Sequence, residues 1–255
     1  FQQDSSLEIQ ALALQVASAL RPRSPEISRW LDQAAAGPAL LRLAAARDPF
    51  PENSTRLQGL LEDSEPGIRV AACQANTGAL QELLLSALSD PHQGVRVAAV
   101  KALRLHPDVN NPQAVEALLK SFSDPSRQVR QEAATTLITG AEKSSGPARE
   151  LLQQTLTSQN PLQRLHALQA LTRLLQRSAV PAIKALIPQE TTSENIAAGI
   201  LALAALAPSG SCGDLLQQYL EHPSPQVRTA LAHAVGRLQP PGCEPVLQKL
   251  CVDKQ

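Results

Sequence analysis

The chain alternates between stretches in which apolar residues recur every three to four positions and short polar stretches that contain proline or glycine. Such apolar spacing is typical of one buried face of an α-helix. The clearest examples lie at residues 80–88, 114–122, 148–156, 179–187 and 213–220. No segment alternates apolar and polar residues with the period of two that a half-buried β-strand shows. The pattern therefore predicts an all-α fold.

A second helical segment, richer in alanine, follows each amphipathic one. It is clearest in SDPHQGVRVAAVKAL (89–103) and, 34 positions later, in SDPSRQVRQEAATTL (123–137). In both copies an aspartate at a proline-containing turn precedes an arginine by six positions. Proline suits such a turn, or the first position of the helix after it. Each unit is therefore predicted to consist of two antiparallel helices joined by a polar turn.

The six-residue offset before an arginine occurs in five units. The pairs are Asp63 and Arg69, Asp90 and Arg96, Asp124 and Arg130, Ser158 and Arg164, and His222 and Arg228. A sixth unit keeps the apolar helix but has Ile196 at the arginine position. Successive units begin 27 to 34 residues apart, a unit length typical of stacked helical hairpins. A hairpin of this size cannot bury its own apolar face, so the units are expected to stack around one continuous core.

The repeats divide the chain into three predicted parts of one continuous solenoid domain. Residues 1–53 are predicted to form irregular helices that include a degenerate repeat. Residues 54–238 contain the regular repeats, and residues 239–255 are predicted to form a capping helix at the carboxyl end.

The repeated pattern D-P-x-x-x-V-R-x-x-A-x-x-A-L resembles HEAT repeats, and more closely the short bacterial units of the phycobilisome-lyase-like subgroup. Residues 89–103 and 123–137 match it best, and residues 221–235 match nearly as well. The resemblance implies a right-handed superhelix, or α-solenoid, of stacked antiparallel helical hairpins.

The same resemblance implies a structural ladder between adjacent units, in which turn aspartates meet helix arginines. Carried over to this chain, Asp63, Asp90 and Asp124 would meet Arg69, Arg96 and Arg130. Ser158, Ile196 and His222 break the pattern after residue 157, while Arg164 and Arg228 keep their places in the arginine row. An arginine can donate two bonds to one carboxylate and further bonds to helix-terminal carbonyls. Such pairs, buried in a row, fix the register of neighbouring hairpins more than they add stability.

Composition and charge argue against several classes of function. The chain has 23 basic and 23 acidic residues, so it has no general field that would attract nucleic acid or an anionic membrane surface. Aromatic residues make up 2% of the chain, whereas proteins that bind single-stranded nucleic acid stack bases on aromatic faces. The longest apolar run, residues 197–207, is shorter than the roughly 20 residues that span a bilayer. We therefore expect neither nucleic-acid binding nor membrane insertion.

The sequence contains no recognisable catalytic or metal-binding arrangement. Its five histidines show no metal-ligand spacing with a nearby acid, and no nucleophile motif or glycine-rich phosphate loop is present. Cys212 and Cys243 occupy matching positions in consecutive units. Equivalent positions in stacked helices lie ~8–10 Å apart, and a disulfide needs Cα atoms at ~4.4–6.8 Å, so no direct bond is expected unless the loops converge. We expect no enzyme activity, no cofactor and no metal.

These features favour a non-catalytic scaffold for protein–protein interaction, whose concave surface is formed by the second helices. A protein or peptide is the expected partner, and the chain is expected to be a monomer or a module of a larger protein. The candidate contact residues are polar and lack aromatic anchors: Lys101, Arg104, Gln131, Thr135, Gln169, Arg173 and Arg237.

Two alternative functions stay open. One is a tetrapyrrole or cofactor lyase or chaperone of the phycobilisome-lyase type, and the other is nucleic-acid binding by a HEAT-like concave surface. The compartment is also open: a cytoplasmic location is slightly favoured, but a cleaved signal peptide would leave no trace.

Overall fold

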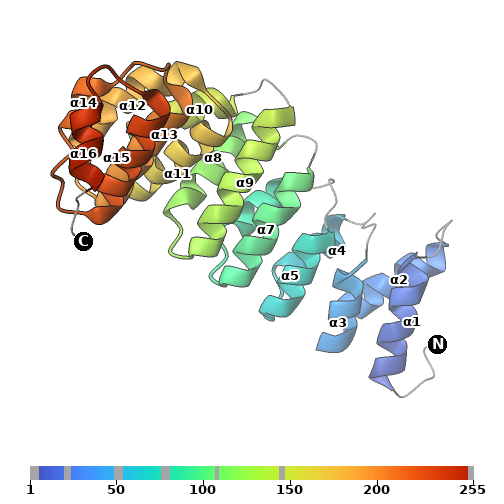
Figure 1. Ribbon diagram of the computed structural model, residues 1–255. Coiled ribbons are helices and arrows are strands. Elements are labelled where there is room, and N and C mark those ends of the chain that lie inside the picture. Colours follow the sequence, from blue (N-terminus) through green and yellow to red (C-terminus); the bar gives the residue numbers. More distant parts are fainter. Residues whose placement is uncertain are drawn as a thin grey trace. The chain divides into compact units, whose positions relative to one another are not determined.

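The computed structural model describes residues 6–19, 24–48, 54–75, 81–106, 109–143 and 147–251. In these ranges every regular element is a helix, and none is a strand (Figure 1). The predicted all-α fold of helical hairpins is therefore confirmed. The chain divides into two compact units, residues 1–109 with 125–136 and residues 110–124 with 137–255. The handedness of a superhelix and the boundaries after residues 53 and 238 stay predictions.

The first unit stacks its second helices in chain order. Helices α4 and α5, and then α6 and α7, form antiparallel hairpins, and α3, α5 and α7 contact one another in succession (Figure 1). Its elements are α1 (Leu7–Ala19), α2 (Pro25–Ala35), α3 (Ala39–Ala46), α4 (Ser54–Leu61), α5 (Pro66–Ala75), α6 (Gln81–Ala87), α7 (Gln93–Leu105) and the beginning of α9 (Arg127–Lys143).

The second unit repeats this arrangement with three complete hairpins, α10 with α11, α12 with α13, and α14 with α15. The second helices α11, α13 and α15 contact one another in that order. The elements are α8 (Pro112–Lys120), the 3-10 turn η1 (Ser121–Ser123), the end of α9, α10 (Ala148–Thr155), α11 (Pro161–Arg173), η2 (Arg177–Ala179), α12 (Val180–Leu186), η3 (Ile187–Gln189), α13 (Ser193–Leu206), α14 (Gly213–Gln217), α15 (Pro225–Leu238) and α16 (Glu244–Cys251).

The second helices α11 and α13 begin at polar caps. The Asn160 side chain accepts a hydrogen bond from the Leu162 N–H at 2.9 Å, and Pro161 occupies the first position of α11. The side chain of Thr192 caps α13 in the same way. Such caps satisfy backbone donors that have no partner within the helix. The turns before α11 and α13 therefore fix where these two helices begin.

The core of the second unit contains large side chains from both helices of each hairpin, together with small residues on the second helices. Leu152 and Ile183 are fully buried, and the second helix α11 buries Ala167 and Ala170 against its neighbours. The closest approach is at Gly199 on α13, where an added Cβ would lie 2.6 Å from Cγ1 of Ile187. Small residues thus allow consecutive helices to pack closely, and they project little from the surface of the second helices.

No helix within the described ranges combines the length and the apolarity that crossing a bilayer requires.

Candidate functional site

The repeated arginines hold the turn of their own repeat and a carboxylate of the next one. Arg69 on α5 donates from Nε and Nη2 to the Asp90 carboxylate at 2.7 and 2.9 Å, and from Nη1 to the Asp63 carbonyl at 2.7 Å. Arg164 on α11 repeats this geometry. It donates to the Glu190 carboxylate at 2.6 and 2.7 Å and to the Ser158 carbonyl at 2.8 Å. Each of these arginines therefore connects two consecutive hairpins.

The bond to the turn carbonyl explains the six-residue offset in the sequence. Nη1 of Arg96, Arg164 and Arg228 donates to the carbonyl of the residue six positions earlier, at 2.8 to 2.9 Å. Because the acceptor is a backbone atom, the side chain at that position can change without loss of the bond. Ser158 and His222 therefore occupy it as well as aspartate does. Arg130 donates to the Pro125 carbonyl, five positions earlier, at 3.1 Å.

These contacts correct the predicted pairing of carboxylates. The Asp63 carboxylate receives bonds from Arg42 of the preceding hairpin, at 2.6 and 3.3 Å, and not from Arg69. Asp90 likewise pairs with Arg69, whereas Nη1 of Arg96 binds the backbone of its own turn. The side chain of the acidic residue thus faces the arginine of the hairpin before it.

The ladder resumes once after residue 157, where the sequence predicts that it is broken. Glu190 lies six positions before Ile196 and supplies the carboxylate that Arg164 binds. Glu190 was not predicted, because its repeat lacks the arginine that marks the others. Arg42 was not predicted, because the amino-terminal repeat is degenerate. The signal for Glu190 in the sequence is an acidic residue at the turn position, six residues before Ile196.

Burial and hydrogen bonding act in opposite directions on the ladder carboxylates. The Asp90 side chain is 10% exposed, and its burial, the largest single effect, raises its pKa. Hydrogen bonds from Arg69 and from the His92 N–H, with the Arg69 charge, outweigh burial and hold the pKa of Asp90 below its ordinary value. For Asp63, bonds from Arg42 and the Glu65 N–H likewise outweigh burial and lower the pKa.

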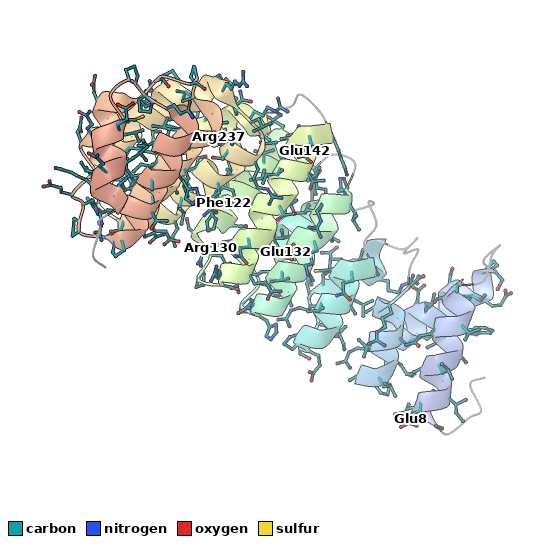
Figure 2. All side chains as sticks on the ribbon, in the orientation of Figure 1. Glu8, Phe122, Arg130, Glu132, Glu142 and Arg237 are labelled. Atoms are coloured by element: carbon teal, nitrogen blue, oxygen red, sulfur yellow. The ribbon has the colours of Figure 1, made fainter. Side chains whose placement is uncertain are left out.

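In the first unit, two predicted contact residues are engaged in ion pairs. Lys101 Nζ and Arg104 Nη1 each lie 3.3 Å from a carboxylate oxygen of Glu132, which Figure 2 labels on α9. The exposed Gln131 accepts, through its carbonyl, a bond from the Thr135 hydroxyl at 3.0 Å. Glu132 therefore offsets one of the two positive charges of Lys101 and Arg104 within the same unit.

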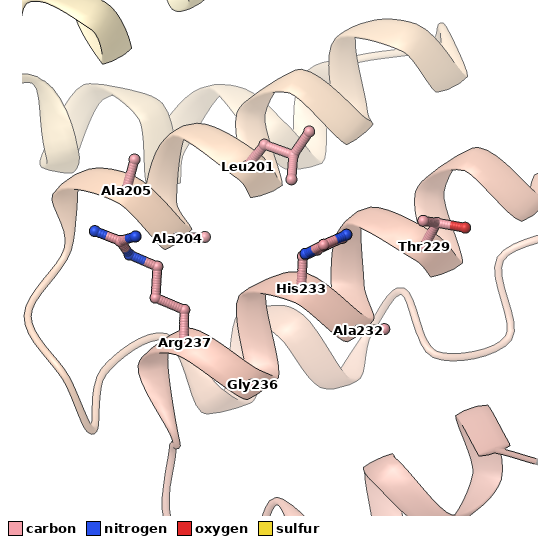
Figure 3. Close-up of a pocket in the computed structure, with 8 residues that line it drawn as sticks. All are labelled: Leu201, Ala204, Ala205, Thr229, Ala232, His233, Gly236 and Arg237. Carbon is pink, nitrogen blue, oxygen red and sulfur yellow. The ribbon is translucent and has the colours of Figure 1, made fainter.

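In the second unit, a hollow of about 740 Å³ lies between α13 and α15. Leu201 is 44% exposed at its edge, and Figure 3 shows the Arg237 side chain extending from α15 toward Ala205 of α13. Alanine and glycine form its low floor. The hollow is lined by Leu201, Ala204, Ala205, Thr229, Ala232, His233, Gly236 and Arg237.

A second hollow of about 480 Å³ extends the first one to α11. The two share Leu201, Thr229 and His233, so together they form one surface depression across three second helices, here called the groove. The additional residues that line it are Leu165, Gln169, Glu194, Ala197, Ala198, Gln226 and Ala230.

The structure places three of the predicted contact residues at or near the groove. Gln169 and Arg237 line it. Arg173 is exposed in the last turn of α11, four residues beyond Gln169. The apolar part of the groove was not predicted, because Leu201 lies in the apolar run 197–207 and no contact residue was expected there.

Groups that could support chemistry are sparse in the described residues. No cluster of three or more histidine, cysteine, aspartate or glutamate side chains within these ranges is arranged to hold a metal ion. Cys73, Cys212 and Cys243 are free thiols, and the side chain of Cys251 lies outside the description. Burial, with a smaller effect of Asp90, raises the pKa of the Cys73 thiol to about 12, so it is protonated at neutral pH.

Comparisons with known proteins identify the kind of repeat that the chain contains. Residues 80–145 match the family model for HEAT repeats. Among solved structures, human deoxyhypusine hydroxylase in complex with glycerol is similar, with 22% sequence identity, a TM-score of 0.38 and coverage of 92% of each chain. No curated protein matches the chain. The matched segment contains the two best sequence copies of the repeat, and the chain therefore carries HEAT repeats.

Proposed function

We propose that this protein is a non-catalytic scaffold that binds a protein or peptide segment in the groove. The observation that carries the proposal is the continuity of the groove over α11, α13 and α15. An extended partner can contact three repeats at once along such a surface, which is the way stacked-repeat proteins use their concave faces.

The groove has the chemical make-up of a protein-binding surface. An apolar side chain of a partner would cover Leu201 and the alanine floor, and burial of apolar area contributes about 25 cal/mol per Å². Gln169, Glu194 and Gln226 surround this apolar part with hydrogen-bonding groups. An apolar centre with a polar rim is the usual anatomy of an interface. Because packed helices form the groove, its residues lose little conformational entropy when a partner binds.

The ladder argues against the nucleic-acid alternative. Binding a duplex requires several cations that can reach phosphates. The guanidinium groups of Arg69 and Arg164 are instead bonded to carboxylates and turn carbonyls, and their side chains are 11% and 15% exposed. The repeated arginine row is therefore a joint between hairpins and does not supply a phosphate-binding strip.

The groove also offers little support for the lyase alternative. Covalent handling of a cofactor needs a reactive side chain in an enclosed apolar pocket. Among the residues that line the groove, His233 is the one with an ionisable ring, and no cysteine or tyrosine is present. This composition favours reversible binding over group transfer.

Selection from a phage-displayed library of random twelve-residue peptides tests the proposal. We expect selected peptides to bind the protein and to lose at least tenfold in affinity to Leu201→Asp, measured by fluorescence anisotropy. Gln217→Asp, an exposed change on the first helix α14, is the control and should bind as the unchanged protein does. Equal binding to both variants would remove the groove as the site, provided that circular dichroism shows both to be folded.

A further inference from the structure

We propose that the groove recognises a peptide segment in which two acidic residues flank an apolar one. This inference rests on the proposed function and adds the chemistry of the partner to it. It is carried by a row of three equivalent positions on α11, α13 and α15.

Arg173 and Arg237 occupy the same register position in two different repeats. Arg173 lies nine residues after the ladder residue Arg164, and Arg237 lies nine residues after Arg228. The equivalent position on α13, nine residues after Ile196, is Ala205. The row therefore consists of an exposed arginine, a small residue and a second exposed arginine.

A hollow with an apolar floor lies between the middle position of the row and Arg237. Ala204, Ala205 and Leu201 form the α13 side of the 740 Å³ hollow, and Arg237 borders it from α15. Figure 3 shows the guanidinium of Arg237 beside this space. Its volume lies within the roughly 300–1,000 Å³ typical of ligand pockets, so an apolar side chain of a partner fits there.

The basic and acidic residues around the groove lie at opposite ends of its helices. Arg173 and Arg237 lie in the last turns of α11 and α15. The acidic lining residue, Glu194, lies in the first turn of α13, eleven residues before Ala205, which is about 16 Å along a helix. Glu190 is held by Arg164 and has a fully buried side chain. The end of the groove near Arg237 therefore complements an acidic partner.

The spacing of the row sets the spacing of the acidic residues. Neighbouring packed helices lie ~8–10 Å apart, so the two arginines are separated by roughly 16–20 Å. A peptide in the polyproline II conformation advances about 3.1 Å per residue and has three residues per turn. The two acidic side chains should therefore be about six positions apart, with the apolar residue midway between them and on the same face of the peptide.

Two matched phage libraries test this pattern. Each fixes Leu at the centre of an eleven-residue peptide and randomises the other positions, except that the residues three before and three after Leu are both Glu in one library and both Lys in the other. We expect the Glu library to be enriched at least tenfold over the Lys library on the unchanged protein. The double variant Arg173→Glu with Arg237→Glu should reverse this preference.

A charge-reversing variant outside the groove provides the matched control. Arg149→Glu should keep the preference for the Glu library, because Arg149 is exposed on the first helix α10 and does not line the groove. If peptides bind and Leu201→Asp abolishes binding, but neither library is preferred or the double variant changes nothing, the acidic pattern is wrong and the proposed function stands. If neither library is enriched and the random library also fails at the groove, both are overturned.

The arginines also lie at helix carboxyl termini, where a positive charge stabilises the helix by interacting with its dipole. A purely structural role would lower the melting temperature of the double variant without reversing the library preference. Thermal unfolding of the same samples distinguishes the two roles, and unchanged melting with a reversed preference supports binding.

Discussion

Arg164 on α11 and Glu190 of the following repeat form a two-bond ion pair, with the Glu190 side chain fully buried and the Arg164 side chain 15% exposed. Loss of one partner from such a pair leaves a buried group without compensation, which is strongly destabilising. We expect Arg164→Ala to lower the free energy of unfolding by about 3 kcal/mol. Urea unfolding followed by circular dichroism measures the change.

Arg173→Ala is the matched control on the same helix. Its side chain is exposed, and exposed substitutions usually change stability by less than about 0.5 kcal/mol. The double variant Arg164→Leu with Glu190→Leu should recover part of the loss, because it removes both buried charges together. An Arg164→Ala protein as stable as the Arg173→Ala protein would contradict the structural role of the ladder.

Acid should weaken the ladder through its aspartates. The pKa values of Asp63 and Asp90 are lowered in the folded chain by bonds from Arg42 and Arg69 that outweigh burial. Their stabilisation is therefore fully present above the unfolded pKa of about 3.9 and is lost as pH falls through the lower folded value. Asp90→Asn should reduce the loss of stability between pH 6 and pH 3, measured from urea midpoints.

Asp214→Asn is the control for that experiment, since Asp214 is exposed in the first turn of α14. It should leave the pH dependence close to that of the unchanged protein. An Asp90→Asn protein with the same acid sensitivity as the unchanged one would show that the carboxylate of Asp90 does not contribute there.

Cysteine labelling should report on the folding of the first unit. Cys73 is fully buried, and burial raises the pKa of its thiol to about 12, so the thiolate that reacts with iodoacetamide is scarce. Partly exposed Cys212 should be alkylated in the native protein, and Cys73 only after urea unfolding. Peptide mass spectrometry separates the two sites. Native labelling of Cys73 at the rate of Cys212 would disagree with the packing around α5.

The close contact at Gly199 predicts opposite effects of two glycine-to-alanine changes. An added Cβ at Gly199 would lie 2.6 Å from Cγ1 of Ile187, whereas nothing lies within 4 Å of one added at Gly236. We expect Gly199→Ala to destabilise the protein by ~1–3 kcal/mol and Gly236→Ala to stabilise α15 by up to ~1 kcal/mol. Thermal melting compares them.

A double-variant cycle isolates the contact with Ile187. Ile187→Ala removes the atom that the new methyl group would meet, so its combination with Gly199→Ala should cost less than the sum of the two single changes. Strict additivity would show that Gly199 is constrained by something other than this contact.

Local features of the fold were predictable, and its contacts across repeats were not. The apolar period and the offset between Asp90 and Arg96 indicate a turn and a second helix, because both depend on residues close in sequence. The partner of Arg69 is 21 positions away at Asp90, and which turn faces an arginine depends on how hairpins stack. The apolar hollow is also a product of stacking, since Ala204 and Gly236 are unremarkable within their own helices.

Ion pairs on the surface of the second helices were also not predictable from the sequence. Lys101 and Arg104 lie on α7, but both pair with Glu132, 28 or more positions later, which offsets one of their two charges. Their sequence neighbours do not indicate this pairing. Arg237 and Gln169 line the groove as predicted contact residues, while the apolar character of their surroundings depends on the exposed Leu201.

Arg164 depends on the next repeat for its counterion, Glu190, so removing a repeat changes the partner of this arginine. If the hairpin of α12 and α13 were excised, Arg164 would face a turn with His222 in place of Glu190. Its guanidinium would keep the carbonyl of Ser158 and lose its counterion. Whether a HEAT unit of this chain can be deleted or duplicated is therefore decided by the acidity of the turn that becomes the new neighbour.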